Sequence, residues 1–143
     1  MDTLICTVGL PRSGKSTWCK KMQEEGWVIV NPDSIRLALH GQRYCIEAEG
    51  FVWATAKVMV KALFLAGNNN IIFDATNTSK KRRDEWRSSM WRTEFKIFDT
   101  SPEICKERAI KDDMEDLISI IDAMYNNWDA LSDEELYKKE PPQ

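Results

Sequence analysis

A segment near the start of the chain constrains its fold more than any other feature. Residues 9–17 read Gly-Leu-Pro-Arg-Ser-Gly-Lys-Ser-Thr, which fits the P-loop pattern of Gly, four residues, Gly, Lys and Ser. The apolar run 4–8 before it has the length of a buried strand, and the residues from Lys15 to Glu25 are compatible with a helix. The alternative is a chance match in a loop, and the flanking strand and helix argue against it. The pattern therefore predicts a strand, a phosphate-binding loop and a helix in succession.

The loop positions have separate physical tasks. Gly9 and Gly14 let the backbone turn tightly and bring its N–H groups close to phosphates, and the helix N-terminus adds further N–H groups and its positive dipole end. Lys15, expected in a solvent-facing loop, can reach the β- and γ-phosphates, and the Ser16 hydroxyl can hold Mg²⁺. We therefore expect ATP and Mg²⁺ as cofactors. The nucleotide-binding residues are expected to be Gly9, Arg12, Ser13, Gly14, Lys15, Ser16 and Thr17.

Length and composition limit the remaining classes. The 143 residues suit one domain, expected over 1–131, with a polar and frayed tail over 132–143. A hydrophobic content of 43% argues against disorder, and the net charge of −3 argues against a broadly basic nucleic-acid surface. No apolar run approaches the ~20 residues of a membrane span, and the early first strand leaves no room for a signal peptide.

The histidine and cysteine content narrows the chemistry. His40 is the only histidine, which argues against a His-based triad or a multi-histidine metal site. The cysteines show no metal-like spacing and are scattered among apolar neighbours, at positions 6, 19, 45 and 105. They indicate reduced core residues and hence an intracellular, cytoplasmic protein.

Strand and helix patterns alternate along the chain. Strands are expected at 4–8, 27–30, 70–74 and 95–98. Helices are expected at 16–25, 32–39, 46–66, 79–90, 102–108 and 114–131, with a loop at 41–44. In the third helix the apolar face is expected at Val52, Thr55, Val58, Met59, Ala62, Leu63 and Ala66, with Lys57 and Lys61 in solvent. In the last helix a core stripe is expected at Leu117, Ile121, Met124, Trp128 and Leu131. The alternation predicts an α/β P-loop fold, with a mostly parallel sheet of about four to five strands and helices on both faces.

Polar residues follow the predicted strands, at the edge where such folds bind ligands. Asp33 and Arg36 lie three apart after the second strand and could accept a proton from a hydroxyl and bind a charged acceptor. The alternative is a helix-dipole aspartate in a surface ion pair. Asp74 ends the third strand and could support Mg²⁺ or bind Ser16, or it could be a turn residue.

A basic run, Lys80-Lys81-Arg82-Arg83, stands at a helix start, where the dipole disfavours cations. With Trp86 and Trp91 nearby it could dock a phosphate-rich acceptor, or it could be a solvated helix face with tryptophans in the core. Arg108 and Lys111 could belong to a lid across ATP, or they could be a salt-bridged helix end.

These motifs together resemble a family of P-loop kinases. The segments Gly9 to Trp18, Asn31-Pro32-Asp33-Ser34-Ile35-Arg36 and Asp74-Ala75-Thr76-Asn77, with Arg82, Arg83 and Trp86, are similar to the family that includes the phage 5′-polynucleotide kinase domain. Zeta-toxin-like kinases, also AAA-type, are more distant relatives. The likeness runs from about Leu4 to Leu131.

The resemblance implies roles for individual residues. It implies that Lys15 and Ser16 bind nucleotide and metal, that Asp33 is the general base, and that Arg36 contacts an acceptor phosphate. Asp74 matches the acid after the third strand, and Arg108 matches the first lid arginine. The second lid arginine of the polynucleotide kinases is replaced by Asp112, beside Lys111, within an acidic lid.

The expected function is ATP-dependent transfer of the γ-phosphate to a hydroxyl, with the 5′-hydroxyl of a nucleic acid as the leading acceptor. One alternative is a kinase of a nucleotide, a nucleoside or another small molecule. A second alternative is a module that binds ATP without catalysis.

Overall fold

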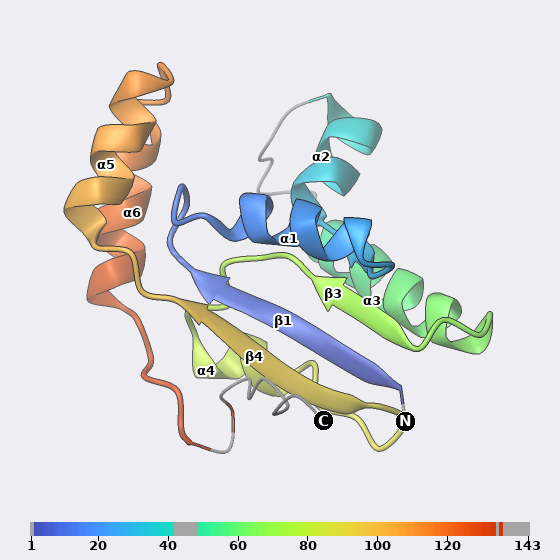
Figure 1. The fold of residues 1–143 in the computed structure, drawn as a ribbon. Coiled ribbons are helices and arrows are strands. Elements are labelled where there is room, and N and C mark those ends of the chain that lie inside the picture. Colours follow the sequence, from blue (N-terminus) through green and yellow to red (C-terminus); the bar gives the residue numbers. More distant parts are fainter. Residues whose placement is uncertain (1, 42–48, 134, 136–143) are drawn as a thin grey trace.

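The computed structural model describes residues 2–41, 49–133 and 135, and its elements alternate as the sequence predicts (Figure 1). The strands are β1 (Thr3–Gly9), β2 (Val28–Val30), β3 (Asn70–Phe73) and β4 (Arg92–Phe98). The helices are α1 (Lys15–Glu24), α2 (Pro32–His40), α3 (Glu49–Leu65), α4 (Lys80–Asp84), α5 (Pro102–Lys111) and α6 (Leu117–Asn126). The expected loop at 41–44 and the helix start at Ile46 lie largely outside the described residues, as does Cys45.

The four strands form one parallel sheet in the order β2-β3-β1-β4. Thr3 pairs with Asn70 of β3 on one side and with Arg92 of β4 on the other, so β1 is central. Because all strands are parallel, their carboxyl ends meet at one edge, where the predicted polar residues follow them. This arrangement confirms the predicted α/β P-loop fold.

Alternate residues of β1 pack on opposite faces of the sheet, as the period of two requires. Leu4, Cys6 and Val8 belong to the larger core, with α3 and Trp86. Ile5 packs with Cys19 of α1 on the opposite face. Helices therefore cover both faces, and α1 is held directly behind the loop that follows β1.

The buried face of α3 only partly matches the expected one: Val52 is buried and Leu63 packs against the core, as predicted. Its core residues are Val52, Ala56, Val60 and Phe64, spaced by four, whereas Val58 of the predicted face is 67% exposed. This helix is apolar on nearly all sides, so periodicity cannot select the face that meets the sheet. The expectation that Lys57 and Lys61 lie in solvent is confirmed.

Two helices end earlier than predicted. α4 ends at Asp84 and not near Met90, because the Trp86 carbonyl accepts hydrogen bonds from the Trp91 indole (3.1 Å) and the Thr93 hydroxyl (2.9 Å) and cannot continue a helix. α6 ends at Asn126 and not near Leu131, because the Asp129 N–H donates to the Thr78 carbonyl and turns the chain aside. The predicted core stripe is still partly buried, and it packs against the two cores that flank α6.

The expected fraying after Ser132 is wrong for the described part of the tail. Glu135 is 2% exposed, and its carboxylate accepts from the fully buried Arg83 at 2.9 Å. Its backbone carbonyl also accepts from the N–H of Phe95 in β4. The polar composition of the tail suggested that its side chains lie in solvent. The Glu135 carboxylate is instead buried, because the buried Arg83 guanidinium requires a counterion.

We expect Glu135→Ala to lower the free energy of unfolding by about 3–5 kcal/mol, because it leaves the Arg83 charge buried without its counterion. Burial opposes ionisation of Glu135, but hydrogen bonds from Ser132 and Arg83 hold its pKa below the usual value. Its stabilising contribution is therefore full above the unfolded-state pKa and is lost as the pH falls through the folded-state pKa.

Urea unfolding at neutral pH measures this change. The matched control is Asp122→Ala, which breaks the more exposed ion pair with Lys106 and should cost much less. Equal losses of unfolding free energy in the two variants would show that the Arg83–Glu135 pair stabilises the protein no more than an exposed ion pair does.

Candidate active site

The loop between β1 and α1 has the backbone that the P-loop motif requires. A Cβ on Gly9 would lie 2.7 Å from the Ser13 hydroxyl and 3.0 Å from the Cβ of Phe98, so only glycine fits there. Gly14 has a φ of 102° and caps the N-terminus of α1, and Arg12 also adopts a positive φ of 68°. The Thr100 hydroxyl donates to the Ser13 carbonyl at 2.9 Å and ties the loop to the end of β4.

Lys15 is held by this loop and does not lie in solvent as expected. Its ammonium group donates to the carbonyls of Gly9 (3.0 Å) and Leu10 (2.6 Å) and to the Ser13 hydroxyl (3.3 Å). Burial lowers the pKa of Lys15 to about 8, while the charge of Asp74 partly offsets this effect. The charge is therefore kept at the loop but is poorly solvated, which favours an incoming anion such as phosphate.

The lowered pKa of Lys15 predicts that ATP binding weakens as the pH rises. A neutral amine lacks the charge that attracts phosphate, and each pH unit above the pKa reduces the charged fraction by about tenfold. We expect up to about a tenfold rise in the ATP dissociation constant between pH 7 and pH 9. Titration by calorimetry measures the constant, and Lys15→Arg, whose charge persists at both pH values, is the control. A parallel pH dependence in the two proteins would assign the effect to another group.

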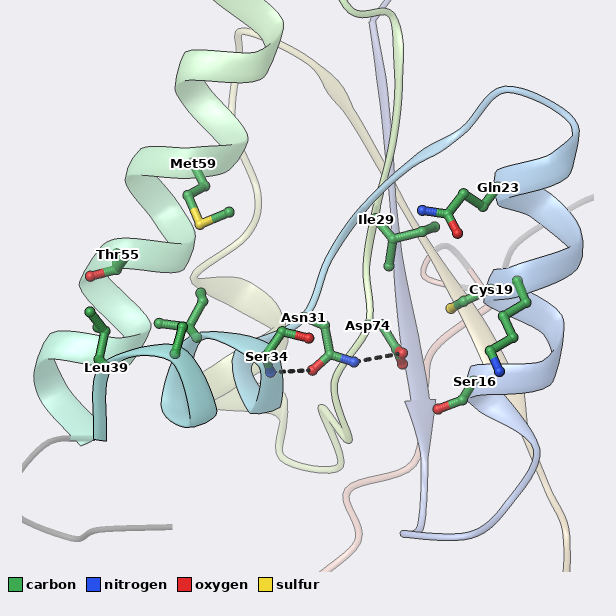
Figure 2. A pocket seen from close by; sticks show the side chains of 13 residues that line it. Ser16, Cys19, Gln23, Ile29, Asn31, Ser34, Leu39, Thr55, Met59 and Asp74 are labelled. Carbon is green, nitrogen blue, oxygen red and sulfur yellow. Dashed lines mark hydrogen bonds between the residues drawn. The ribbon is translucent and has the colours of Figure 1, made fainter. Parts of the chain in front are cut away.

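Asp74, directly after β3, and Ser16 of α1 line the same hollow. Asp74 is buried and accepts from the Asn31 amide (3.1 Å) and the Thr7 hydroxyl (3.3 Å). Figure 2 shows Asn31 between α2 and Asp74, with Ser16 and Cys19 of α1 opposite, around a hollow of about 600 Å³. Burial raises the pKa of Asp74, and the charge of Lys15 partly counters the rise.

This donor set fits a magnesium ion that is bound mainly by a nucleotide. Mg²⁺ takes oxygen ligands and is commonly held by one or two carboxylates together with substrate phosphates. Ser16 and Asp74 supply one hydroxyl and one carboxylate. Within the described residues there is no group of three or more His, Cys, Asp or Glu side chains that could hold a metal alone.

Asp33 and Arg36 lie at the start of α2, which Asn31 caps by accepting from the N–H groups of Asp33 and Ser34. The Arg36 guanidinium donates to Asp33 at 2.6 Å and forms two hydrogen bonds with Glu49 of α3, at 2.8 and 2.5 Å. The Arg36 side chain is only 13% exposed, whereas Asp33 is 65% exposed. Glu49 thus fixes the arginine and leaves the Asp33 carboxylate open to solvent.

One of the predicted lid residues, Arg108, is hydrogen-bonded to the P-loop. Arg108 of α5 donates to the Arg12 carbonyl at 3.1 Å, and the side chain of Arg12 forms an ion pair with Asp112. Asp112, where the resemblance placed an acid in the lid, therefore pairs with a loop arginine. Lys111 is exposed and is not among the described residues that line the cleft.

A single cleft of about 1560 Å³ brings most of these residues together. Its lining includes the predicted site residues Arg12, Ser13, Gly14, Lys15, Ser16, Thr17, Asp33, Arg36, Asp74 and Arg108. Gly9 does not line it and contributes its carbonyl to Lys15 instead. The P-loop half of the site and the predicted acceptor half therefore share one space.

The residues of the basic run 80–83 and the nearby tryptophans fit partly the docking interpretation and partly the structural one. Arg83 is fully buried and donates to the carbonyls of Asn77 and Thr78, so it supports the loop after β3. Trp86 packs in the core against Phe73, as the structural interpretation expects. Arg82 alone among the four cations lines the cleft.

Comparison with protein families matches residues 4–111 to AAA_33, described as an AAA domain. This chain belongs to that family. The match covers the whole unit from β1 to α5 and confirms the resemblance to P-loop kinases. Within the described part of this AAA_33 chain, no helix is both long and apolar enough to cross a membrane.

Four of the solved structures similar to this AAA_33 chain fall into two groups. One chain in the structure of the Pnkp1/Rnl/Hen1 complex is 31% identical, with a TM-score of 0.68 over 75% of this chain and 38% of that chain. A chain in the Pnkp1/Rnl/Hen1 RNA repair complex is 26% identical, with a TM-score of 0.69 over 90% of this chain and 46% of that one. This chain therefore spans less than half the length of either.

The second group shares the fold at lower identity. A gluconokinase from Sinorhizobium meliloti 1021 is 17% identical, with a TM-score of 0.62 over 90% of this chain and 75% of that chain. A sugar kinase from Janibacter sp. HTCC2649 is 20% identical, with a TM-score of 0.68 over 95% of this chain and 83% of that chain. These two chains therefore share the fold of this chain.

Two residues that bond to predicted site residues were not themselves predicted from the sequence. Thr7 donates to the Ala75 carbonyl at 2.7 Å and also reaches Asp74, and its polarity within an apolar strand was an available signal. Glu49 had no such signal, because an isolated glutamate at a helix start is common and its pairing with Arg36 depends on how α2 and α3 pack.

Proposed function

We propose that this chain is an ATP- and Mg²⁺-dependent kinase that phosphorylates the 5′-hydroxyl of a polynucleotide. The observation that carries the proposal is the shared cleft, in which Lys15 and Ser16 of the P-loop face the same space as Asp33 and Arg36. Related chains in an RNA repair complex support a nucleic-acid acceptor. The catalytic unit would comprise residues 1–131, with Glu135 packed against it.

The chemistry follows from the positions of the side chains. The acceptor oxygen attacks the γ-phosphorus, the bond to the β–γ bridging oxygen breaks, and ADP leaves. Asp33, exposed and at the start of α2, would take the proton of the attacking hydroxyl. Lys15 and Arg108 would offset the charge on the phosphoryl oxygens, and Mg²⁺ held by Ser16 and Asp74 would neutralise the β- and γ-phosphates.

Arg36 would bind a phosphate of the acceptor strand. Its bidentate contact with Glu49 fixes the plane of the guanidinium, and planar cations recognise phosphate with defined geometry. Positioning of this kind is the main contribution that a protein makes to phosphoryl transfer.

A kinase of a small molecule is the second candidate. Asp33 and Glu49 together already occupy much of Arg36, which leaves it fewer donors for an acceptor phosphate. Asp112 likewise occupies part of the Arg12 guanidinium, a cation of the same cleft. An intracellular location suits either candidate, since Cys6, Cys19 and Cys105 are buried free thiols.

Transfer of a labelled γ-phosphate to a panel of acceptors tests the proposal. The panel contains 5′-hydroxyl RNA and DNA oligonucleotides, nucleosides, and sugars such as gluconate. We expect the oligonucleotides to be labelled with the highest kcat/KM. Labelling of a nucleoside or sugar alone would establish the second candidate, and ATP binding without labelling of any acceptor would indicate a non-catalytic module.

A further inference from the structure

One cation–π pair of side chains lines the cleft and has no part in the chemistry described above. The guanidinium carbon of Arg82 lies 4.4 Å from the centre of the Trp53 ring. Both residues line the cleft together with Asp33 and Arg36. Trp53 comes from α3 and Arg82 from α4, so two separate elements build this wall.

The pair is held in place from behind. Trp53 packs edge-on against Phe73, with the ring centres 5.5 Å apart, and Phe73 belongs to the main core. The backbone N–H of Arg82 donates to the Ser79 hydroxyl at 3.2 Å, and its guanidinium lies 3.5 Å from the Glu85 carboxylate. The Arg82 side chain nevertheless remains 44% exposed.

The chemistry of the Trp53–Arg82 pair favours a particular type of ligand. A guanidinium plane stacks on aromatic rings, and unstacked nucleobases bind by stacking on aromatic side chains or on arginine planes. Its positive charge also suits a base that is followed by a phosphodiester. A sugar acceptor has no π face and would gain less from such a plane.

We propose that the Trp53–Arg82 pair forms a stacking platform for the nucleobase of the 5′-terminal nucleotide of the acceptor. This inference rests on the proposed polynucleotide function and adds a specificity determinant to it. Asp33 would accept the proton of the hydroxyl, Arg36 would bind the phosphate, and the Trp53–Arg82 pair would stack on the base. The acceptor would therefore be recognised at three separate chemical groups.

Steady-state kinetics with two matched acceptors test the platform. One is a short 5′-hydroxyl RNA, and the other is the same RNA with an abasic first nucleotide, which keeps the hydroxyl and all phosphates. We expect a KM about tenfold to 100-fold lower for the acceptor that carries the base, in line with the usual energy of stacking. Arg82→Ala should abolish most of that preference, chiefly by raising the KM for the base-carrying acceptor.

Two further variants separate stacking from charge and from general stability. Arg82→Lys keeps the charge but loses the plane, so it should also lose most of the base preference. Arg87→Ala is the matched control, because Arg87 is an exposed arginine beside the same helix, paired with Asp84, and it does not line the cleft. It should retain the preference of the wild type.

The outcomes distinguish this proposal from the proposed function. Equal KM values for the two acceptors in the wild type would overturn the platform and leave the kinase intact. A full base preference in Arg82→Lys would also overturn it, because charge alone would then suffice. Failure of the wild type to phosphorylate either RNA would overturn both proposals together.

Discussion

Replacing Lys15 by alanine is expected to reduce kcat/KM for phosphoryl transfer by about 10²–10³-fold or more. The ammonium lies within the P-loop, bound to the carbonyls of Gly9 and Leu10 and to the Ser13 hydroxyl, where phosphate oxygens would compete for its protons. The alanine side chain carries no cation, so this position no longer offsets the charge that develops on the γ-phosphoryl group. A labelled γ-phosphate assay under single-turnover conditions measures the loss.

The same variant should fold nearly as well as the wild type. Burial of the Lys15 charge is itself unfavourable, as the lowered pKa shows, so its removal offsets the loss of its hydrogen bonds. Urea unfolding and circular dichroism give the comparison. Retained activity in a folded Lys15→Ala protein would contradict the assignment of the P-loop to phosphate binding.

Changing Asp33 to asparagine is expected to lower the chemical step by about 10²–10⁴-fold while the affinity for ATP stays nearly constant. The amide has almost the shape of the carboxylate and can still accept from Arg36, but it cannot take the proton of the acceptor. Rapid-quench kinetics measure the step, and calorimetry measures the ATP affinity.

Asp84→Asn is the matched control for this change. Asp84 is another exposed aspartate that pairs with an arginine three residues later, but it does not line the cleft. It should leave the chemical step unaltered. Weakened ATP binding with a normal rate at saturation in Asp33→Asn would instead make Asp33 a nucleotide or metal ligand.

The P-loop and the sheet were predictable because their signals are local. The loop pattern occupies consecutive residues, and the strands are short apolar runs that must be buried in a parallel sheet. The position of Asp74 at a strand end followed from the same logic, and the structure places it beside Ser16 in the cleft.

The remaining features depend on contacts between distant residues, and periodicity carries no information about those. The end of α4 is decided by two side chains that bond to the Trp86 carbonyl from further along the chain. Glu49 finds Arg36 only once α2 and α3 have packed. The position of Trp53 in the cleft likewise depends on which face α3 turns to the sheet, and that face was predicted only in part.

The central place of β1 in the sheet has a consequence for how the molecule acquires its site. β1 precedes its partners β3 and β4 by more than 60 residues, and Thr7 meets Asp74 across 67 positions of sequence. Closing such long loops must precede the contacts that stabilise them, which slows folding. Arg83, which supports the loop after β3, gains its counterion only from Glu135, 52 positions further on. The cleft that contains the P-loop is therefore fully supported only when this last described residue is in place. A chain truncated before this glutamate would keep the whole P-loop motif while leaving a buried guanidinium without its partner beneath the loop that lines the cleft.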